Sequence, residues 1–279
     1  MMEVIIWGCR GGIPVSGKEY VIFGGNTPCV QVKTPKTCFI IDAGTGIRKL
    51  GELLIQPENF SPEINFLFTH VHWDHILGLP FFKPLYKNIF QKINLFFCPK
   101  HQPKLFDQIL HLFKKPYFPV ERKDIQSKIS IHHLTPSFHY HDLEITSIPL
   151  SHPDPGLGFK FTHQQKVFVY LTDNELNLQH PTGKSYTDYK NFSFQADLLI
   201  HDAEYTQHEY NLTKGWGHSY FESVIQLAIE AKVKKLGIFH HSQHRTDKEL
   251  LKIEKWIKKE LKPFQIDAFV AREHQTIIL

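Results

Sequence analysis

Hydrophobic residues in this 279-residue chain recur in short alternating or continuous runs, which are typical of half-buried and buried β-strands. Turn residues such as glycine and proline separate many of these runs. The predicted strands are Glu3 to Trp7, Cys29 to Lys33, Cys38 to Ile41, Ile64 to Phe68, Ile93 to Cys98, Ile129 to His133, Leu143 to Leu150, Leu157 to Thr162, Val167 to Thr172, Asp197 to Ile200 and Lys235 to Phe239.

Helical spacing of apolar residues is rarer along the chain. It predicts helices over Ile47 to Leu54, Leu105 to Phe113 and Asp247 to Leu261. A further helix is expected after Ser219, which forms a predicted capping box with Glu222 three positions later. The inward face of the last helix is predicted to comprise Leu250, Leu251, Ile253, Trp256 and Ile257.

The predicted strands fall into two groups, each followed by helices. This order favours two sheets packed face to face with helices on both outer sides, an α+β fold with four αββα layers. No internal repeat, low-complexity tract or linker interrupts the chain, so residues 1–279 are expected to form a single domain.

Composition narrows the expected partners. The formal net charge is only +4 and the pI is about 8.7, without the strongly basic footprint of a dedicated nucleic-acid binder. No signal-peptide pattern or apolar run long enough to span a membrane is visible. The four cysteines are scattered and read as reduced core residues. We therefore expect a cytoplasmic protein without membrane association.

The densest chemical signal is the segment His70-Val71-His72-Trp73-Asp74-His75, which follows the predicted strand Ile64 to Phe68. Imidazole and carboxylate groups are ligands for divalent metal ions. A lone histidine is usually satisfied by backbone or water, but this density of ligand types favours a metal site. His70 and His72 are expected to point one way, and Asp74 and His75 another.

Four further polar signals each follow an apolar strand. They are Ser151-His152-Pro153, Leu171-Thr172-Asp173-Asn174, His201-Asp202-Ala203-Glu204 and Phe239-His240-His241. Strand ends are where open sheets place their sites, so these residues complete a candidate set of ligands for two ions. One ion would be held by His70, His72 and His152, the other by Asp74, His75 and His240, with Asp173 as a bridge. The sequence leaves open whether His240 or His241 is the ligand.

Three other segments are predicted to support this site. Asp42-Ala43-Gly44-Thr45-Gly46 lacks the lysine of a phosphate-binding loop and is expected to position Asp42 so that it orients a ligand imidazole. Ile76 to Pro84 is expected to be an apolar lid or the start of a helix. The aromatic loop Lys114 to Val120, which contains Pro116, either clamps a base and a phosphate or packs on a neighbour or a dimer partner.

These histidine and aspartate motifs resemble the metallo-β-lactamase-fold superfamily of metal-dependent hydrolases, over nearly the whole chain. Asp173 as a bridging ligand and Gly217-His218-Ser219 before a helix are similar to the phosphodiesterase branch that contains ribonuclease Z. The resemblance implies that His218 assists proton transfer to the leaving group and that Glu204 orients His218.

Four longer strings look like a bacterial subgroup of cyclic-nucleotide phosphodiesterase-like proteins. They are Trp7 to Gly12, Phe23 to Thr27, Asp42 to Gly46 and Gly215 to Ser219. Gly11-Gly12 replaces a more usual Gly-Ser pair in that pattern. The chain lacks an obvious glycine- and lysine-rich arm of the sort with which ribonuclease Z grips tRNA.

The resulting hypothesis is a metal-dependent phosphodiesterase that uses a water activated by two divalent ions, zinc or manganese. Asp74 would hydrogen-bond this water and His218 would protonate the leaving oxygen. The expected substrate is a cyclic nucleotide or similar small phosphodiester, and the family resemblance suggests a homodimer. The alternatives are a ribonuclease Z-like nuclease acting on RNA 3′ ends, or a catalytically silent metal-bound module that binds nucleic acid or a protein partner.

Overall fold

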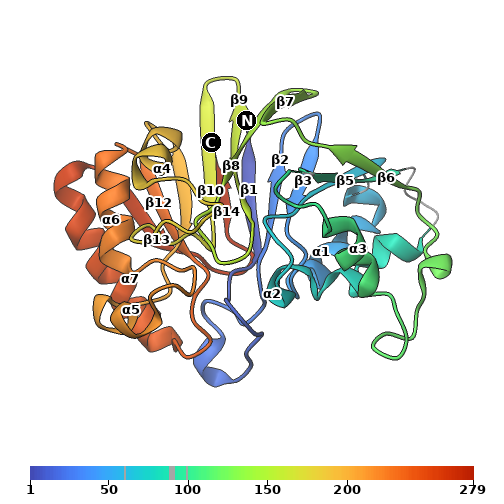
Figure 1. Cartoon of the computed structure of the whole chain (residues 1–279), viewed down its shortest axis with the longest axis horizontal. Helices are drawn as coiled ribbons and strands as arrows, with labels where there is room; N and C mark the ends of the chain where they lie inside the picture. Colours follow the sequence, from blue (N-terminus) through green and yellow to red (C-terminus); the bar gives the residue numbers. More distant parts are fainter. Residues whose placement is uncertain (60, 88–91, 99) are drawn as a thin grey trace.

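A computed structural model describes residues 1–59, 61–87, 92–98 and 100–279 of the chain, and Figure 1 shows its two sheets side by side. The strands are β1 (Glu3–Gly8), β2 (Cys29–Lys33), β3 (Cys38–Ile41), β4 (Glu63–Leu67), β5 (Lys92–Phe97), β6 (Ile129–His133), β7 (Ser137–Tyr140), β8 (Leu143–Pro149), β9 (Leu157–His163), β10 (Lys166–Leu171), β11 (Leu198–Asp202), β12 (Lys235–Phe239), β13 (Asp267–Val270) and β14 (Thr276–Ile278). The α-helices are α1 (Ile47–Leu54), α2 (Trp73–Ile76), α3 (Leu105–His111), α4 (Tyr186–Phe192), α5 (Gln207–Thr213), α6 (Phe221–Glu230) and α7 (Asp247–Leu261).

Each sheet contains seven strands, in the orders β14-β1-β2-β3-β4-β5-β6 and β13-β12-β11-β10-β9-β8-β7. Both sheets are mixed. The strands from β3 to β6 are parallel, as are those from β10 to β13, whereas the remaining neighbours are antiparallel. Parallel neighbours bring their carboxyl ends to one edge of a sheet, and His70, Asp173 and His240 follow such strands.

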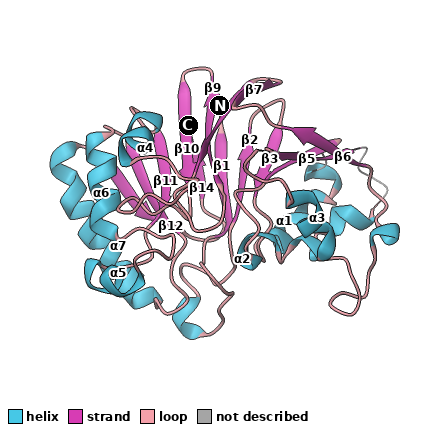
Figure 2. Ribbon diagram, in the orientation of Figure 1, coloured by secondary structure: helices cyan, strands magenta, loops and turns pink. Residues whose placement is uncertain are grey.

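Three hydrophobic cores hold the layers together. The middle core lies between the sheets and includes Val4, Phe39, Phe161 and Tyr170. A second core packs α4, α6 and α7 on the outer face of the C-terminal sheet, and a third packs α1, α2 and α3 on the outer face of the other. Figure 2 shows the helices on the two flanks with the strands between them. The predicted four-layer αββα fold is therefore confirmed.

The sequence prediction missed several short elements. Strand β14 has only three residues and pairs with β1 from the opposite end of the chain, so that both termini lie close together (Figure 1). Strands β7 and β13 have four residues each, and α4 and α5 have seven. Elements of this length carry too few periodic positions to be recognised without their tertiary partners.

Two local predictions were wrong, and two segments differ in extent or form from what the sequence predicted. Ser219 does not cap α6, because its hydroxyl donates to the Asn174 carbonyl and accepts from the Leu176 amide. Leu251 is 41% exposed rather than inward on α7. Helix α3 ends at His111, two residues earlier than expected. The segment after α2 forms short 3-10 turns whose Leu79, Pro80 and Phe82 are buried, so most of it belongs to the core rather than to a lid.

The described residues contain no helix that is both long and apolar enough to cross a bilayer.

Candidate metal centre

The predicted ligands converge at one edge of the two sheets. His70 to His75 follow β4, His152 follows β8, Asp173 follows β10 and His240 follows β12. The ligating atoms within each of three groups lie within 4.8 Å of one another, and one of these groups comprises Asp173, His218 and His240. We call His70, His72, His152 and Asp173 the outer cluster, and Asp74, His75 and His240 the inner cluster.

Asp173 joins the two clusters. Its Oδ2 lies 3.4 Å from His70 Nε2 and 3.3 Å from His75 Nε2, and its Oδ1 lies 3.3 Å from His240 Nε2. In the inner cluster, Asp74 Oδ2 is 3.1 Å from His240 Nε2 and 3.5 Å from His75 Nε2. One carboxylate therefore stands between donor sets from both sheets, which is the position required of a bridging ligand.

Buried partners orient the inner imidazoles. Asp42 Oδ2 lies 2.8 Å from His75 Nδ1, and both side chains are fully buried. The same carboxylate accepts hydrogen bonds from the amide and hydroxyl of Thr69, which fixes it below the loop. His75 thus presents Nε2 to the cluster. As expected, Asp42 lies beside the imidazole of a predicted ligand. Such a carboxylate partner also raises the basicity of a ligating imidazole.

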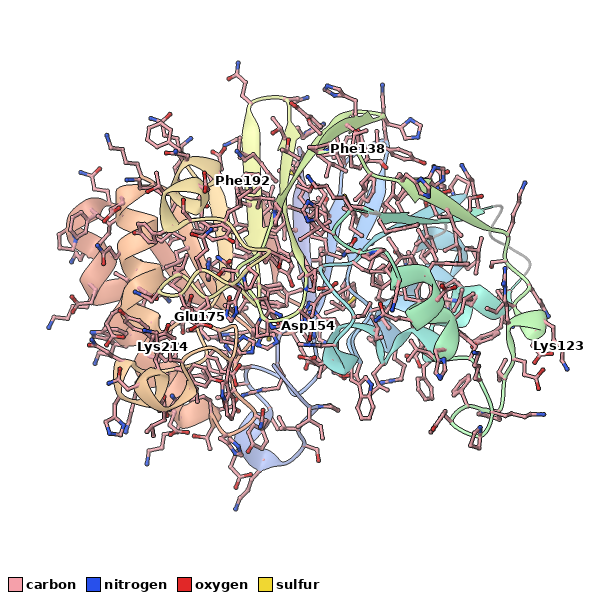
Figure 3. All side chains as sticks on the ribbon, in the orientation of Figure 1. Lys123, Phe138, Asp154, Glu175, Phe192 and Lys214 are labelled. Atoms are coloured by element: carbon pink, nitrogen blue, oxygen red, sulfur yellow. The ribbon has the colours of Figure 1, made fainter. Side chains whose placement is uncertain are left out.

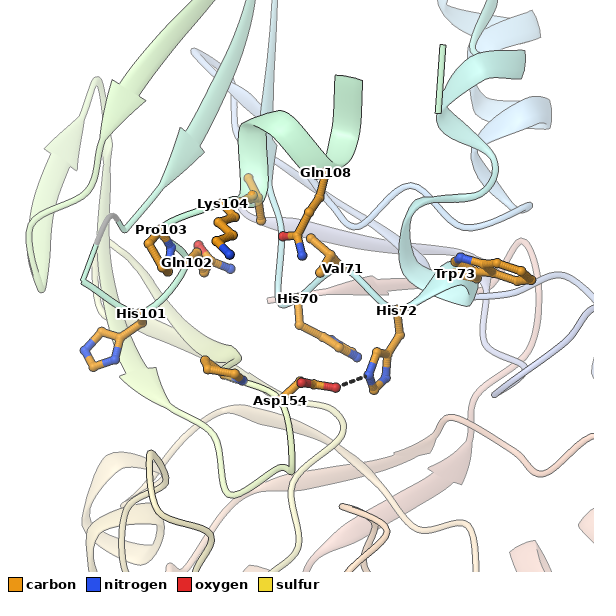
Figure 4. A pocket seen from close by; sticks show the side chains of 12 residues that line it. His70, Val71, His72, Trp73, His101, Gln102, Pro103, Lys104, Gln108 and Asp154 are labelled. Carbon is orange, nitrogen blue, oxygen red and sulfur yellow. Dashed lines mark hydrogen bonds and ion pairs between the residues drawn. The ribbon is translucent and has the colours of Figure 1, made fainter. Parts of the chain in front are cut away.

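The outer imidazoles are oriented by groups nearer to solvent. Asp154 Oδ2 lies 2.8 Å from His72 Nε2 (Figure 4), which leaves Nδ1 of His72 available to a metal ion. The His72 side chain is 41% exposed and that of Asp154 is 66% exposed. His152 Nδ1 lies 3.2 Å from the Asp154 carbonyl oxygen, which leaves its Nε2 free. The sequence analysis did not identify Asp154, although it follows His152 by only two positions.

His240, and not His241, enters the cluster. His241 Nε2 lies 2.9 Å from the Ala271 carbonyl oxygen, and burial with the nearby charge of Arg10 lowers the pKa of His241 to about 3. The imidazole of His241 is therefore a neutral hydrogen-bond donor in the core. Gly11 lies against the ring of His240, and a side chain at Gly11 would collide with that ring.

Backbone conformation at three strand ends aims the side chains. Asp42, Asp173 and His240 have φ angles of 61°, 58° and 56°, in the left-handed region that residues other than glycine rarely adopt. Each of these residues follows a strand directly or within two positions. The backbone therefore turns at the point where the side chain meets the other side chains of the site. Local strain of this kind persists only where surrounding contacts impose it, and it is concentrated at functional sites.

The donor atoms fit divalent cations. Nε2 of His70 and Nε2 of His75 are buried and have no hydrogen-bond partner among the described residues, although both face Asp173. Buried nitrogens without a partner are rare in folded proteins. Burial lowers the pKa of His75, but Asp173, Asp74 and Asp42 outweigh it and raise that pKa well above its usual value. The carboxylates thus favour positive charge at this point, and imidazole with carboxylate suits divalent metal ions.

His70 and His152 have the opposite tendency. Burial, together with His75, lowers the pKa of His70 well below its usual value. Burial also lowers the pKa of His152 to about 4. Both rings are therefore neutral at pH 7, which is the form that binds metal.

His218 lies beside the inner cluster. Its ring stacks on that of His240 with centroids 4.9 Å apart. Its Nδ1 is 3.4 Å from Asp202 Oδ2, and its Nε2 is 3.6 Å from Glu204 Oε2. Burial opposes protonation, but Glu204 and Asp202 prevail and raise the pKa of His218 to about 9. Glu204 Oε2 is also 3.4 Å from His240 Nδ1, so it contacts a predicted ligand as well as His218.

Two supporting carboxylates were not assigned roles from the sequence. Asp202 accepts hydrogen bonds from the amides of Asn174 and Ser219, which ties the loop after β10 to the loop that carries His218. Glu175 is fully buried and accepts hydrogen bonds from the amides of Gly215 and Gly217 and from the Tyr210 hydroxyl. Figure 3 shows Glu175 and Asp154 near the same end of the strands, far from Phe138. The only sequence signal for a supporting role of Glu175 is its position two residues after Asp173.

Two aromatic rings of the loop from Lys114 to Val120 have different surroundings. Phe118 packs on Phe81 and Phe113, with ring centroids 5.4 Å and 6.2 Å apart. Tyr117 is 80% exposed. One aromatic ring of the loop therefore belongs to the protein's own packing and the other faces solvent.

The comparison with known families decides the classification. Residues 37–241, which contain every predicted ligand, match the model of the beta-lactamase superfamily domain. The chain belongs to this superfamily. Together with curated ribonuclease Z relatives that align along most of its length, this match makes the chain a metallo-β-lactamase-fold hydrolase of the ribonuclease Z and phosphodiesterase branch, as the motifs predicted.

Individual relatives are distant. Ribonuclease Z from Thermococcus sibiricus is 27% identical over 87% of this chain and 87% of its own length. The fold is shared with a diphosphatase from the PhnP family (TM-score 0.71, 17% identity, 100% of this chain and 98% of the other). It is also shared with yeast PDE1 (TM-score 0.71, 14% identity, 100% of this chain and 99% of the other). At these identities the structural matches establish the fold alone.

Proposed function

We propose that the protein hydrolyses a small phosphodiester, with a cyclic nucleotide as the most fitting substrate, at a centre of two divalent metal ions. The placement of His218 carries this proposal. A phosphodiesterase needs a proton donor for the departing oxygen beside its metal ligands, and His218 stacks on His240 between two carboxylates. The ribonuclease Z name of the aligned relatives supports phosphodiester chemistry.

The side chains would divide the work. His70, His72 and His152 would hold one ion, Asp74, His75 and His240 the other, and Asp173 both. The chemistry supplied by two bound ions is a lowered pKa of a shared water and neutralisation of charge on the phosphate. Asp74, held by a hydrogen bond from the Gly12 amide, would accept a hydrogen bond from the attacking water. His218 would donate a proton to the leaving oxygen, with Glu204 and Asp202 keeping its ring in place.

The main rival is a ribonuclease Z-like nuclease that acts on RNA 3′ ends. Sequence similarity to ribonuclease Z from archaea and bacteria favours it. The lack of an obvious glycine- and lysine-rich arm in the sequence favours the small substrate. The remaining rival, a silent metal-bound module, would not require His218 beside the ligands.

A substrate panel tests the proposal. The purified protein, loaded with zinc or with manganese, is assayed on bis-p-nitrophenyl phosphate, on 3′,5′- and 2′,3′-cyclic nucleotides and on a precursor tRNA. We expect turnover of the aryl diester and of at least one cyclic nucleotide. Cleavage of the precursor tRNA with no turnover of cyclic nucleotides would support the nuclease instead. Absence of turnover on every diester by metal-loaded protein would support the silent module.

A further inference from the structure

A groove leads from the outer cluster towards α3. Its inner part has a volume of about 510 Å³ and is bordered by His70, His72 and Asp154 (Figure 4). Its outer part has a volume of about 900 Å³ and is bordered by Phe81 and Tyr117. We call the two parts together the α3 groove. Val71, Trp73, Lys104 and Gln108 line both parts, so they are continuous.

The walls of the α3 groove present aromatic surface to solvent. Trp73 is 75% exposed, Phe81 54% and Tyr117 80%. These rings come from α2, from the turn after it and from the aromatic loop, and they surround one cavity rather than lying apart on the surface. Each part of the groove has a volume within the range of about 300–1,000 Å³ that, with apolar walls and few polar groups, is typical of a site for a small molecule.

The α3 groove has one cationic side chain near the predicted metal ligands. Its charged lining residues are Lys104, Asp107 and Asp154. Gln108 points towards Val71, and Lys104 lies beside Gln102 in the same part of the groove as His70 (Figure 4). A cation and an amide therefore stand between the predicted metal ligands and the aromatic walls.

We propose that the α3 groove binds the nucleobase of the substrate, with Trp73 and Tyr117 as the residues on which the base stacks. This inference rests on the proposed phosphodiesterase function. If the phosphate lay at His70 and His72, the nucleoside attached to it would extend towards Val71. The flat base would there contact exposed aromatic rings. Stacking on aromatic rings tolerates every base, because each base has a π-face, and Lys104 complements the phosphate charge.

Two esters with the same leaving group separate this inference from the function on which it rests. Thymidine 5′-p-nitrophenyl phosphate carries a base, whereas methyl p-nitrophenyl phosphate does not. In both, water adds to phosphorus, the bond to the aryl oxygen breaks, and the products are p-nitrophenol and a phosphate monoester. We expect kcat/KM to be about 5- to 100-fold higher for the thymidine ester, the range that one stacked base supplies.

Variants of the groove test which residues cause the preference. Tyr117→Ala and Trp73→Ala should each reduce the ratio of the two kcat/KM values, chiefly through KM, and Tyr117→Phe should retain it. Phe264→Ala serves as the control, because Phe264 is also an exposed aromatic residue (54%) but lies after α7, outside the groove. Its ratio should equal that of the wild type.

Three outcomes would overturn the inference. Equal kcat/KM for the two esters would show that the groove does not bind the base. A ratio unchanged in both alanine variants would place the base elsewhere. A change of oligomeric state in Tyr117→Ala, measured by light scattering after size exclusion, would assign the aromatic surface to a second copy of the chain. Hydrolysis of neither ester by metal-loaded protein would instead refute the proposed function.

Discussion

The inner and outer clusters use the same ligand types but differ in their surroundings. In the inner cluster, Asp42 orients His75 from a fully buried position, and Glu204 contacts His240. In the outer cluster, the exposed Asp154 orients His72 beside the α3 groove. Rigid buried partners hold a ligand better than mobile exposed ones, because less conformational freedom remains to be lost when the ion binds.

This difference suggests that the inner and outer clusters have different roles within one centre. The inner cluster lies against the C-terminal sheet and His218, the proposed proton donor, which is held between carboxylates. The outer cluster borders the cavity through which a substrate would enter. We therefore expect the inner ion to be retained more firmly and the outer ion to exchange more readily.

Asp173→Asn should have the largest effect, because it weakens the carboxylate between both clusters. We expect loss of both ions and a decrease in kcat larger than the roughly 10- to 100-fold that partners outside the ligand set usually contribute. Metal content by mass spectrometry and the rate on bis-p-nitrophenyl phosphate measure this. Asp267→Asn, at a carboxylate that is 66% exposed, is the control. Retention of one full equivalent of metal would mean that the clusters are independent.

His218→Ala should leave both ions bound and reduce kcat by about 10²- to 10⁴-fold, the usual contribution of a general acid. The change removes the proposed proton donor without removing a predicted ligand. His208→Ala, an exposed histidine on α5, should behave as the wild type in metal content and rate. Full activity in His218→Ala would exclude the proton-donor role, and loss of metal would make His218 a ligand.

The comparison itself is tested by Asp42→Asn and Asp154→Asn. Asp42→Asn should weaken binding of the inner ion by about 10- to 100-fold, because Asn cannot serve as the same charged acceptor for His75. Asp154→Asn should weaken the outer ion by less, since its carboxylate is mostly solvated. Metal titration with competing chelators measures both, and thermal unfolding of the metal-free variants shows whether Asp42→Asn also disturbs the fold. Equal losses would contradict the division into a firm and a labile site.

Glu175→Gln should have the smallest effect on rate. Glutamine keeps one carbonyl oxygen for the amides of Gly215 and Gly217 but loses the charge and the second acceptor. We expect a decrease in the free energy of unfolding of about 1–3 kcal/mol and a decrease in kcat smaller than that of His218→Ala, with KM unchanged. Denaturant unfolding and steady-state kinetics measure these quantities. If metal binding decreased more than kcat, the role of Glu175 would be to support the predicted ligands and not to position His218.

Much of the fold and most residues of the candidate site could be predicted from the sequence, because their signals are local. A buried strand is visible as an apolar run, and a ligand at its end is visible as a polar residue that interrupts the pattern. Four chemically active residues within six positions, His70 to His75, form such a signal by themselves. The recurrence of polar residues after later strands extended the set to His152, Asp173 and His240.

Other features depended on contacts between distant parts of the chain. The sequence could not choose His240 over His241, because the choice is made by a left-handed backbone at His240 and by the Ala271 carbonyl that accepts from His241. Nor could it show β14 pairing with β1, or Glu175 holding the loop of His218. Residue types and strand ends are properties of neighbouring positions, whereas ligand orientation and the α3 groove arise only when separate segments pack together.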